Sequence, residues 1–283
     1  ESFTPDTNTL LGEVPEIKNF FVSCGLNSIG IGSGGGVGKV TAEWLINGHI
    51  NEDIFNYDIK RFQNFHSQIT FIKNRITETL GDLYGMHWPF KQHKTSRNIK
   101  TVPHHDLLKE AGACFGVSGG YERPMWFALK GQNAEYEYSY KYQNWFPAAD
   151  FETKNCRKNV GIFELSPFSK FEIKSEQAHN ELQRICTANI KNEKGKCVYT
   201  QMLNIDGGIE ADLTVVCIDD NHFRIVSSAS TRERDKFHIK KHLKENIKLT
   251  DVTDDYCVLG LFGPKSRKLM HKLSKDDFSN ENF

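Results

Sequence analysis

The sequence contains no long apolar run and no excess of charge of either sign. No segment approaches the roughly 18 consecutive apolar residues that a membrane-spanning helix needs. Lys plus Arg and Asp plus Glu number 36 each, so no net positive charge attracts nucleic acid or an anionic membrane surface. The N-terminal text "ESFTPDTNTLLGE" resembles neither a secretory signal nor a transit peptide. We therefore expect no membrane span, no nucleic-acid partner and a ligand that is recognised locally.

Cysteine pairs with the spacing of a redox or zinc motif are also missing. The seven cysteines form no CxxC pair and most have apolar neighbours, which predicts reduced thiols in a cytosol or a mitochondrial matrix. Histidine offers no clearer motif, because His87, His93, His104 and His105 lack the spacing and the acidic companions of a metal site. We therefore expect no metal ion. The cysteines are Cys24, Cys114, Cys156, Cys186, Cys197, Cys217 and Cys257.

Glycine, in contrast, is concentrated in one short stretch. Residues 30–39 read "GIGSGGGVGK" and follow the apolar run "NFFVSCGLNSI", a pattern that predicts a turn between a strand and a helix. Apolar residues then recur at helical spacing as far as Leu45, and Gly48 follows as a C-terminal cap. Bare backbone in such a turn allows a phosphate or a flat ring to approach the main chain.

The common nucleotide motifs do not account for this stretch. A Walker loop requires glycine where Ser33 stands and Ser or Thr where Val40 stands. The dinucleotide pattern GxGxxG is present at residues 30–35, but Glu52 and Asp53 lie in a polar loop instead of at the end of a second strand. From these residues alone, a turn that serves only close packing of the helix remains an alternative.

The chain changes character along its length. Residues 54–100 predict a helix with basic and aromatic residues, followed by a linker that contains Pro and His. Beyond them, short runs of β-branched or aromatic residues alternate with helical stretches near 104–114, 150–159, 178–187 and 231–246. This mixture predicts an α+β fold with mainly antiparallel strands. The predicted strands are "VGIFELS", "SKFEIKS", "KCVYTQMLN", "LTVVCID", "HFRIVSS" and "CVLGLFG".

Several motifs in a fixed order carry a resemblance to a known family. They include "LGEVPEIKNFFVSCGLNSIGIGSGGGVGK", "YDIKRF", "GYERPMWF", "VGIFELSPFSKFEI", "YTQMLNIDGGIEADLTV" and "VLGLFGPKSRKLM". With them the chain resembles the sarcosine and dimethylglycine dehydrogenases over essentially its whole length, as an internal piece of a longer protein. The resemblance implies three parts. Residues 1–53 would be the strand-turn-helix end of a DAO-like FAD-binding domain, 54–100 a central linker region, and 101–283 the first part of an aminomethyltransferase-like, GcvT-like folate-binding domain.

The resemblance also implies an activity for the parent protein, whereas the chain alone is expected to be inactive in oxidation. Family members oxidise the N-methyl group of an N-methyl amino acid, pass a hydride to FAD and transfer the one-carbon unit to tetrahydrofolate; an electron acceptor is then needed. A helix N-terminus would stabilise the negative charge that reduced flavin develops. The residues expected to approach the flavin are the glycines of the turn and two polar neighbours: Gly32, Gly34, Gly35, Gly36, Gly38, Asn27 and Ser28.

In the folate-binding part, the resemblance points to one carboxylate. The family's folate-domain aspartate lies in a Gly-Gly-x-x-x-Asp-Leu pattern, which ends here at Asp212. A carboxylate there could hydrogen-bond the pterin or handle a proton during transfer. Related aminomethyltransferases often carry a second acidic residue where this chain has Ala211, and Glu210 stands one position earlier. Tyr199 and Met202 are expected to line the pterin cavity. The alternatives are that Asp212 only begins a strand and that Tyr199 and Met202 only pack.

Three readings of the chain compete. Within the first, an N-methylglycine dehydrogenase, sarcosine is slightly favoured over dimethylglycine because "YDIKRF" and "GGIEADLTV" are closer to the sarcosine form. The second is a non-catalytic protein similar to the pyruvate dehydrogenase phosphatase regulatory subunit, which shares the architecture. The third is an aminomethyltransferase without flavin chemistry. Residues 1–53 argue against it, because a free-standing transferase does not need the end of an FAD-binding domain. The first reading implies the mitochondrial matrix in a eukaryote and the cytoplasm in a bacterium.

Overall fold

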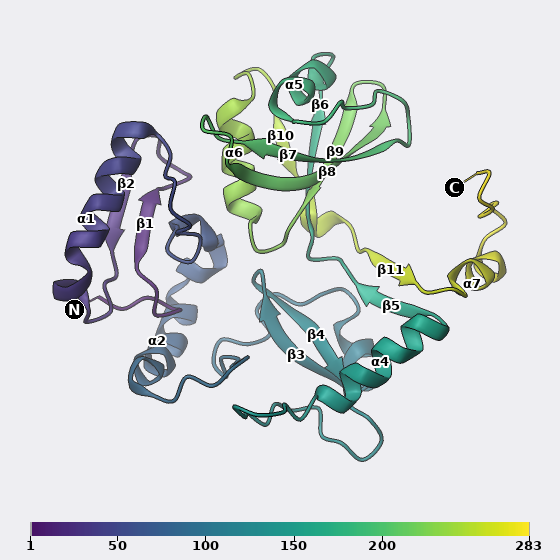
Figure 1. Cartoon of the computed structure of the whole chain (residues 1–283), viewed down its shortest axis with the longest axis horizontal. Coiled ribbons are helices and arrows are strands. Elements are labelled where there is room, and N and C mark those ends of the chain that lie inside the picture. The colour runs from purple at the N-terminus through teal and green to yellow at the C-terminus, as the bar shows by residue number, and fades with distance from the viewer. Residues whose placement is uncertain (1, 283) are drawn as a thin grey trace. The chain divides into compact units, whose positions relative to one another are not determined.

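The structure, a computed structural model, describes residues 2–282 and has the expected α+β character. It consists of two compact units, each assembled from separate stretches of the chain (Figure 1). The first unit comprises the described residues up to 86 together with 93–96 and 168–253. The second comprises residues 87–92 and 97–167 and the described residues from 254 onward.

Antiparallel pairs make up all the described sheets. The strands are β1 (Leu10–Glu13), β2 (Phe21–Cys24), β3 (Ala113–Ser118), β4 (Tyr121–Phe127), β5 (Gly161–Glu164), β6 (Ser169–Lys174), β7 (Cys197–Leu203), β8 (Ile209–Asp219), β9 (His222–Ser227), β10 (Leu249–Asp251) and β11 (Leu259–Phe262). The α-helices are α1 (Gly30–Asn47), α2 (Ile69–Tyr84), α3 (His105–Glu110), α4 (Phe146–Lys158), α5 (Ala178–Ile185), α6 (Arg232–His242) and α7 (Ser266–Leu273). Short 3-10 turns occupy Ile59–Arg61, Asn64–Ser67 and Thr253–Asp255.

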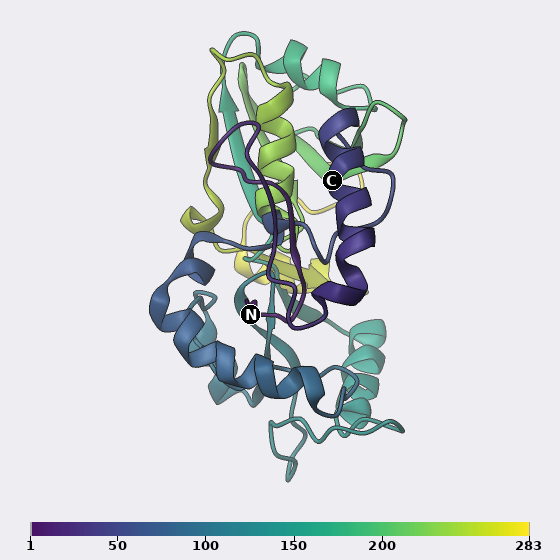
Figure 2. The same cartoon turned by 90° about the vertical axis from the view of Figure 1, so that its left-hand side faces the viewer.

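The core of the first unit is a five-stranded sheet in the order β10-β6-β9-β8-β7. Apolar residues alternate along its strands and bury one face against α5 and α6, and Figure 2 shows α6 running beside the strands. Each fully buried Leu, Ile or Phe contributes about 1.5 to 3 kcal/mol, so this face dominates the stability of the unit. Its innermost side chains are Phe171, Ile173, Leu182, Met202, Phe223, Ile225 and Ile239.

The hairpin of β1 and β2 packs against α1 through one aromatic side chain. Trp44 is buried and meets Phe21 edge to face, with ring centroids 6.1 Å apart. A Cβ at Gly12 would lie 2.5 Å from the Trp44 ring, and Gly12 also has φ +107°. Only glycine suits both conditions. At the other end of the helix, Gly48 adopts the left-handed conformation and its N–H bonds the Trp44 carbonyl, as its position predicted.

The glycine-rich stretch differs from its predicted structure. The turn after β2 is formed by residues 25–29, and the helix begins at Gly30, so the whole glycine run is helical. Positive φ angles occur before the run, at Gly25, Asn27 and Ser28. Glycine disfavours a helix by about 1 kcal/mol per residue, but Trp44 packing and the Gly48 cap fix the remainder of α1. The prediction treated every glycine as a turn residue, although i to i−4 bonds can continue through glycine.

Among its described residues, the second unit contains two small two-stranded sheets, three α-helices and a separate core. β3 pairs with β4 and β5 pairs with β11, and Trp126 packs with Cys114 and Ala148 in the core. Arg97 donates hydrogen bonds through Nε and Nη2 to the buried carboxylate of Glu122, at 2.6 and 2.5 Å. Two parallel charge-assisted bonds of this kind fix the segment that follows Arg97 beside β4.

Candidate functional site

The face of the five-stranded sheet opposite α5 and α6 carries the polar residues that the sequence singled out. Along β8, Ala211 and Leu213 are buried, whereas Asp212 between them is exposed. Asp212 lies directly opposite Gln201 of β7, whose side-chain Nε2 donates to the Asp212 carboxylate at 3.1 Å. Tyr199 of β7 stands two positions before Gln201 and is 65% exposed. The strand pairing therefore gathers a carboxylate, an amide and a phenol on one open surface.

Asp212 changes the chemistry of the neighbouring phenol. The Asp212 carboxylate accepts a hydrogen bond from Tyr199 and raises the pKa of that phenol above its ordinary value. Tyr199 therefore keeps its proton at neutral pH and remains a donor. The pair offers a ligand both an acceptor and a donor at adjacent positions.

The glycine pattern before Asp212 forms the β7–β8 connection. Asn204 closes this turn, since its Oδ1 accepts hydrogen bonds from the N–H groups of Asp206 and Gly208 at 3.1 and 2.7 Å. Gly207 has φ +83°, which favours glycine. Glu210 has no cross-strand partner at a β-bulge and pairs with Arg234 of α6 at 3.0 Å. The turn thus positions Asp212, and Glu210 serves to join β8 to α6.

Met202 does not share this surface. Its side chain is fully buried and packs with the core against α5 and α6. The register explains this, because Met202 lies opposite Ala211 and so points to the buried face, whereas Tyr199 and Gln201 point to the other. The structure favours the packing alternative for Met202 over the predicted contact with a pterin.

A charged group that the sequence analysis missed lies on the same sheet face. Glu172 of β6 lies opposite Arg224 of β9, which donates to its carboxylate at 2.6 Å, and His222 lies at 2.9 Å. Burial raises the pKa of Glu172, but these hydrogen bonds outweigh burial and hold its pKa below the ordinary value. The group could have been found only by knowing which strands pair, since 52 positions separate Glu172 from Arg224.

The predicted flavin contacts have different environments from one another. Asn27 is buried, and its side chain ties residues 2–8 to the turn by accepting from the Thr4 N–H and donating to the Thr7 and Gly25 carbonyls, at 2.9, 2.9 and 2.7 Å. This is a structural role. Ser28 is exposed and has φ +65°.

The glycines of α1 face open space, but only some of their backbone N–H groups are available to a ligand. Apart from the adjoining backbone of the helix, no atom of the described residues lies within 4 Å of a Cβ placed at Gly32, Gly34, Gly35, Gly36 or Gly38. The first intrahelical bond runs from the Ser33 N–H to the Ile29 carbonyl at 3.0 Å. N–H groups later in the helix are therefore engaged, and only those of the first turn can serve a ligand. The glycine run leaves room for a flat group, and residues 30–32 supply its donors.

The first unit also contains a cavity of about 420 Å³. Its walls come from the end of α1, the loop after it, the β7–β8 turn and α6. Lys60, buried at its edge, bonds the Glu13 carbonyl and the Asp58 carboxylate, both at 3.0 Å. Burial lowers the pKa of His238 to about 4, so this wall residue is neutral at physiological pH. Sequence alone could not reveal a cavity whose walls come from four separate segments.

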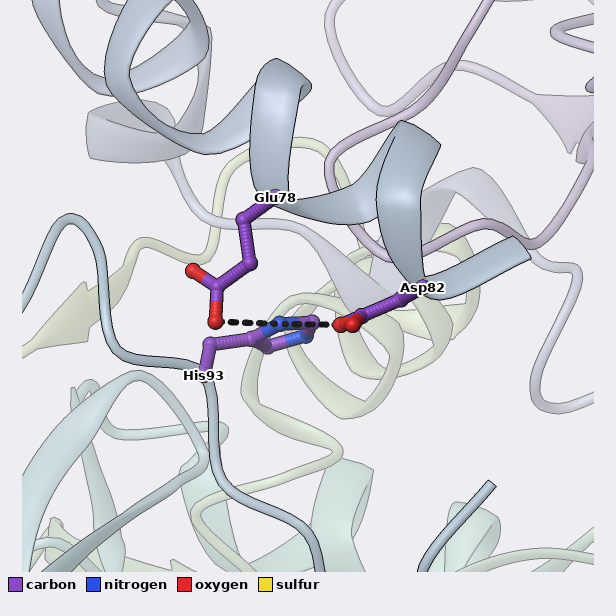
Figure 3. A group of neighbouring side chains, drawn as sticks. All are labelled: Glu78, Asp82 and His93. Atoms are coloured by element: carbon purple, nitrogen blue, oxygen red, sulfur yellow. Dashed lines mark ion pairs between the residues drawn. The ribbon is translucent and has the colours of Figure 1, made fainter. Parts of the chain in front are cut away.

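Two histidines have the acidic companions that the sequence analysis did not find. His93 lies near Glu78 and Asp82 of α2, as Figure 3 shows, with its Nδ1 3.9 and 3.6 Å from their carboxylate oxygens. In the second unit, His104 lies 3.1 Å from Glu164. The companions were missed because they are not near these histidines in the sequence; the fold brings residues 78 and 93 together across a helix end and a loop.

Comparison with known families identifies the larger part of the chain. Residues 104–283 match the GCVT N-terminal domain. The chain belongs to this family. Residues 47–101 match the FAD dependent oxidoreductase central domain. The predicted resemblance, which combined an FAD-dependent oxidoreductase with a GcvT-like domain, is confirmed.

Curated relatives cover the whole chain but are much longer. A 4-methylaminobutanoate oxidase (formaldehyde-forming) from Paenarthrobacter nicotinovorans is 40% identical over 99% of this chain and 34% of its own length. The mitochondrial pyruvate dehydrogenase phosphatase regulatory subunit of Mus musculus and sarcosine dehydrogenase of Homo sapiens are each 31% identical over 100% of this chain, which covers 33% and 35% of their lengths. The chain thus spans about a third of the length of these relatives.

A solved structure supports the fold. The chain is similar to the glycine cleavage system aminomethyltransferase T from Bartonella henselae, with a TM-score of 0.51 and 20% identity over 61% of this chain and 43% of that one. The predicted aminomethyltransferase-like α+β fold is therefore confirmed. Among residues 2–282, no helix combines the length and the apolar character needed to cross a membrane.

Proposed function

We propose that the protein containing this chain oxidises an N-methyl amino acid with FAD and transfers the methyl carbon to tetrahydrofolate. In this proposal residues 1–53 close the FAD-binding domain, 54–100 form the central region and 101–283 begin the folate-binding domain. The observation that carries it is the exposed Asp212 carboxylate, held by Gln201 and bonded to Tyr199 at the position of the family's folate-domain aspartate. The GCVT match across this region supports it.

The proposed folate site uses complementary hydrogen bonding. A pterin ring presents N–H donors and ring acceptors, which suit the carboxylate of Asp212 and the protonated phenol of Tyr199 respectively. Tetrahydrofolate, when bound, supplies the amine nitrogens that take up the one-carbon unit. Asp212 would hold the pterin in register and accept a proton at its carboxylate as the carbon is transferred. Gln201 keeps this carboxylate oriented between substrate cycles.

For the flavin, the chain offers the exposed start of α1. The N–H groups of residues 30–32 and the positive end of the helix dipole suit a ring on which negative charge develops. The open space beside Gly34, Gly35 and Gly36 would admit the ring without a clash. FAD, when bound, accepts the hydride from the methyl carbon. Asn27 would support this site indirectly by fixing the turn before the helix.

An activity assay must identify which N-methyl amino acid is the substrate. Sarcosine, dimethylglycine and 4-methylaminobutanoate are the candidates that the named relatives suggest, and "YDIKRF" and "GGIEADLTV" favour sarcosine in our proposal. An electron acceptor would reoxidise the flavin. We place a eukaryotic protein in the mitochondrial matrix, as in the mitochondrial relatives, and a bacterial one in the cytoplasm.

The test is oxidation of these three amines by the full-length protein that contains this chain, with an artificial electron acceptor and with or without tetrahydrofolate. The variant is Asp212→Asn, and Asp219→Asn, exposed on the same strand, is the matched control. We expect wild type and control to form 5,10-methylene-tetrahydrofolate, and Asp212→Asn to oxidise the amine but release formaldehyde. Equal methylene-tetrahydrofolate formation by all three proteins would contradict the role of Asp212.

A second candidate function rests on the 31% identity with the phosphatase regulatory subunit. In that case the full-length protein would be folded but would oxidise none of the three amines. It would instead change the activity of pyruvate dehydrogenase phosphatase when added to it. The two functions are thus separated by the same preparation in two assays.

A further inference from the structure

We propose that Glu78, Asp82 and His93 form a binding site for a divalent first-row transition cation such as Mn²⁺ or Zn²⁺. All three belong to the first unit: Glu78 and Asp82 lie on α2, and His93 lies on the separate stretch 93–96. None of the three residues is among those proposed to hold the folate or the flavin, so the proposal stands independently of the oxidoreductase activity.

The backbone places the three ligands together. Glu78 and Asp82 are four residues apart, so both side chains leave the same face of α2, and Figure 3 shows both directed toward the His93 ring. One ligand atom of each residue lies within 4.8 Å of the other two, and His93 Nδ1 is 3.9 Å from Glu78 Oε1 and 3.6 Å from Asp82 Oδ2. These separations allow one cation to approach all three atoms, and shifts of a few tenths of an ångström would bring the atoms to ordinary ligand distances of about 2.0 to 2.2 Å.

The hydrogen bonds around Glu78 fix the direction of its carboxylate, as hydrogen bonds commonly do for the side chains that bind a metal. Oε2 accepts the Thr95 N–H at 2.8 Å and also the Thr95 hydroxyl, while Oε1 accepts the Lys94 N–H at 2.6 Å and still faces His93. A carboxylate oxygen can accept more than one bond, so Oε1 retains capacity for a cation. Outer-shell bonds of this kind fix a ligand's direction before the metal arrives.

Charge and exposure suit a small divalent cation. The side chains of Glu78, Asp82 and His93 are 13%, 22% and 33% exposed, so the site is partly desolvated yet open to water. Arg75 lies 3.9 Å from Glu78 Oε2, on the oxygen that faces Thr95, and it offsets part of the negative charge. Two carboxylates and one imidazole are hard and borderline ligands, and waters would complete the coordination. The bound cation would clamp residues 93–96 to α2.

The test is titration of the chelator-treated chain with MnCl₂, counting free Mn²⁺ by electron paramagnetic resonance. Mn²⁺ is chosen because the exposed thiols of Cys24, Cys197 and Cys257 would compete for Zn²⁺. The variants are Asp82→Asn and His93→Gln. Glu78 is left intact because it also holds the loop. His49→Gln is the matched control, since within residues 2–282 His49 pairs with a single carboxylate, that of Asp206.

We expect one Mn²⁺ per wild-type and His49→Gln chain, and at least about tenfold weaker binding by the two site variants. Mn²⁺ should also raise the melting temperature of wild type but not of the site variants, which controls for variants that are simply less stable. Absence of stoichiometric binding by wild type up to millimolar Mn²⁺, or equal binding by all four proteins, would overturn the proposal.

Discussion

Replacing Asp235 by Asn should make the first unit more stable at neutral pH. Asp235 lies on α6, is 1% exposed and accepts a hydrogen bond from the Thr231 hydroxyl at 2.6 Å. Burial raises the pKa of Asp235 from 3.8 to about 6, outweighing Thr231 and the charge of Arg234, which lower it, while Glu210 adds to the rise. The folded protein therefore holds this proton more tightly than the unfolded chain does.

The sign and size of the effect follow from that difference. Between about pH 4 and pH 6 the folded state binds the extra proton, so stability falls as the pH rises through this window. Above it the folded state carries a buried carboxylate at a constant cost of about 3 kcal/mol, from roughly two pKa units at 1.36 kcal/mol each. Asn has the same shape and no charge. Asp235→Asn should thus gain up to about 3 kcal/mol at pH 7.5 and almost nothing below pH 4.

Asp251 provides a control of opposite sign. Burial raises the pKa of Asp251, but bidentate hydrogen bonds from Arg232, both 2.9 Å, and those from Thr253 outweigh burial and lower its pKa. Its contribution to stability is present above the unfolded pKa and is lost as the pH falls below it. Asp251→Asn should therefore destabilise the unit at pH 7.5, with a smaller effect in acid.

Hydrogen exchange measured by mass spectrometry on peptides of β8 and β9 suits this comparison, because it reports the opening of the first unit separately from the second. Protection should increase in Asp235→Asn and decrease in Asp251→Asn at pH 7.5, after correction for intrinsic exchange rates. A loss of protection in Asp235→Asn at pH 7.5, or a gain of the same size at pH 4, would refute the argument from burial.

Two further predictions concern packing and the sheet surface. Gly12→Ala should lower the free energy of unfolding by about 2 to 5 kcal/mol, because it combines an unfavourable φ with a clash against Trp44. The control Gly195→Ala, with φ +83° and open space, should lower it by about 1 to 2 kcal/mol. Equal urea midpoints for the two variants would exclude the clash. Asp212→Asn should lower the pKa of Tyr199, measured as the difference between ultraviolet pH titrations of wild type and variant, and an unchanged titration would show that the two side chains do not interact.

Much of the fold could be predicted because its signals are local. All six predicted strand runs overlap observed strands, and helices occur within or beside the four stretches predicted beyond residue 100. Alternation along "EADLTVVCID" indicates which residues of β8 are buried. β3, β4 and β10 were not predicted, since Gly116 and Pro124 interrupt the hairpin pattern and β10 has only three residues.

The site could be predicted only in part, because its geometry depends on strand register and on distant contacts. Asp212 and Tyr199 were proposed individually, but their interaction follows from the β7–β8 pairing, and the same register buries Met202. The raised pKa of Asp235 arises from burial that the polar sequence of α6 does not suggest. Similarly, the proposed metal ligand His93 reaches α2 only through a loop whose path the sequence does not specify.

Calorimetric titration of the full-length protein that contains this chain with tetrahydrofolate, under anaerobic and reducing conditions, measures whether Asp212 belongs to a folate site. We expect one binding site in wild type and in the control Asp219→Asn, and at least about tenfold weaker binding in Asp212→Asn, the loss expected for one charge-assisted hydrogen bond. Equal affinity in all three folded proteins, or no binding by wild type, would contradict it.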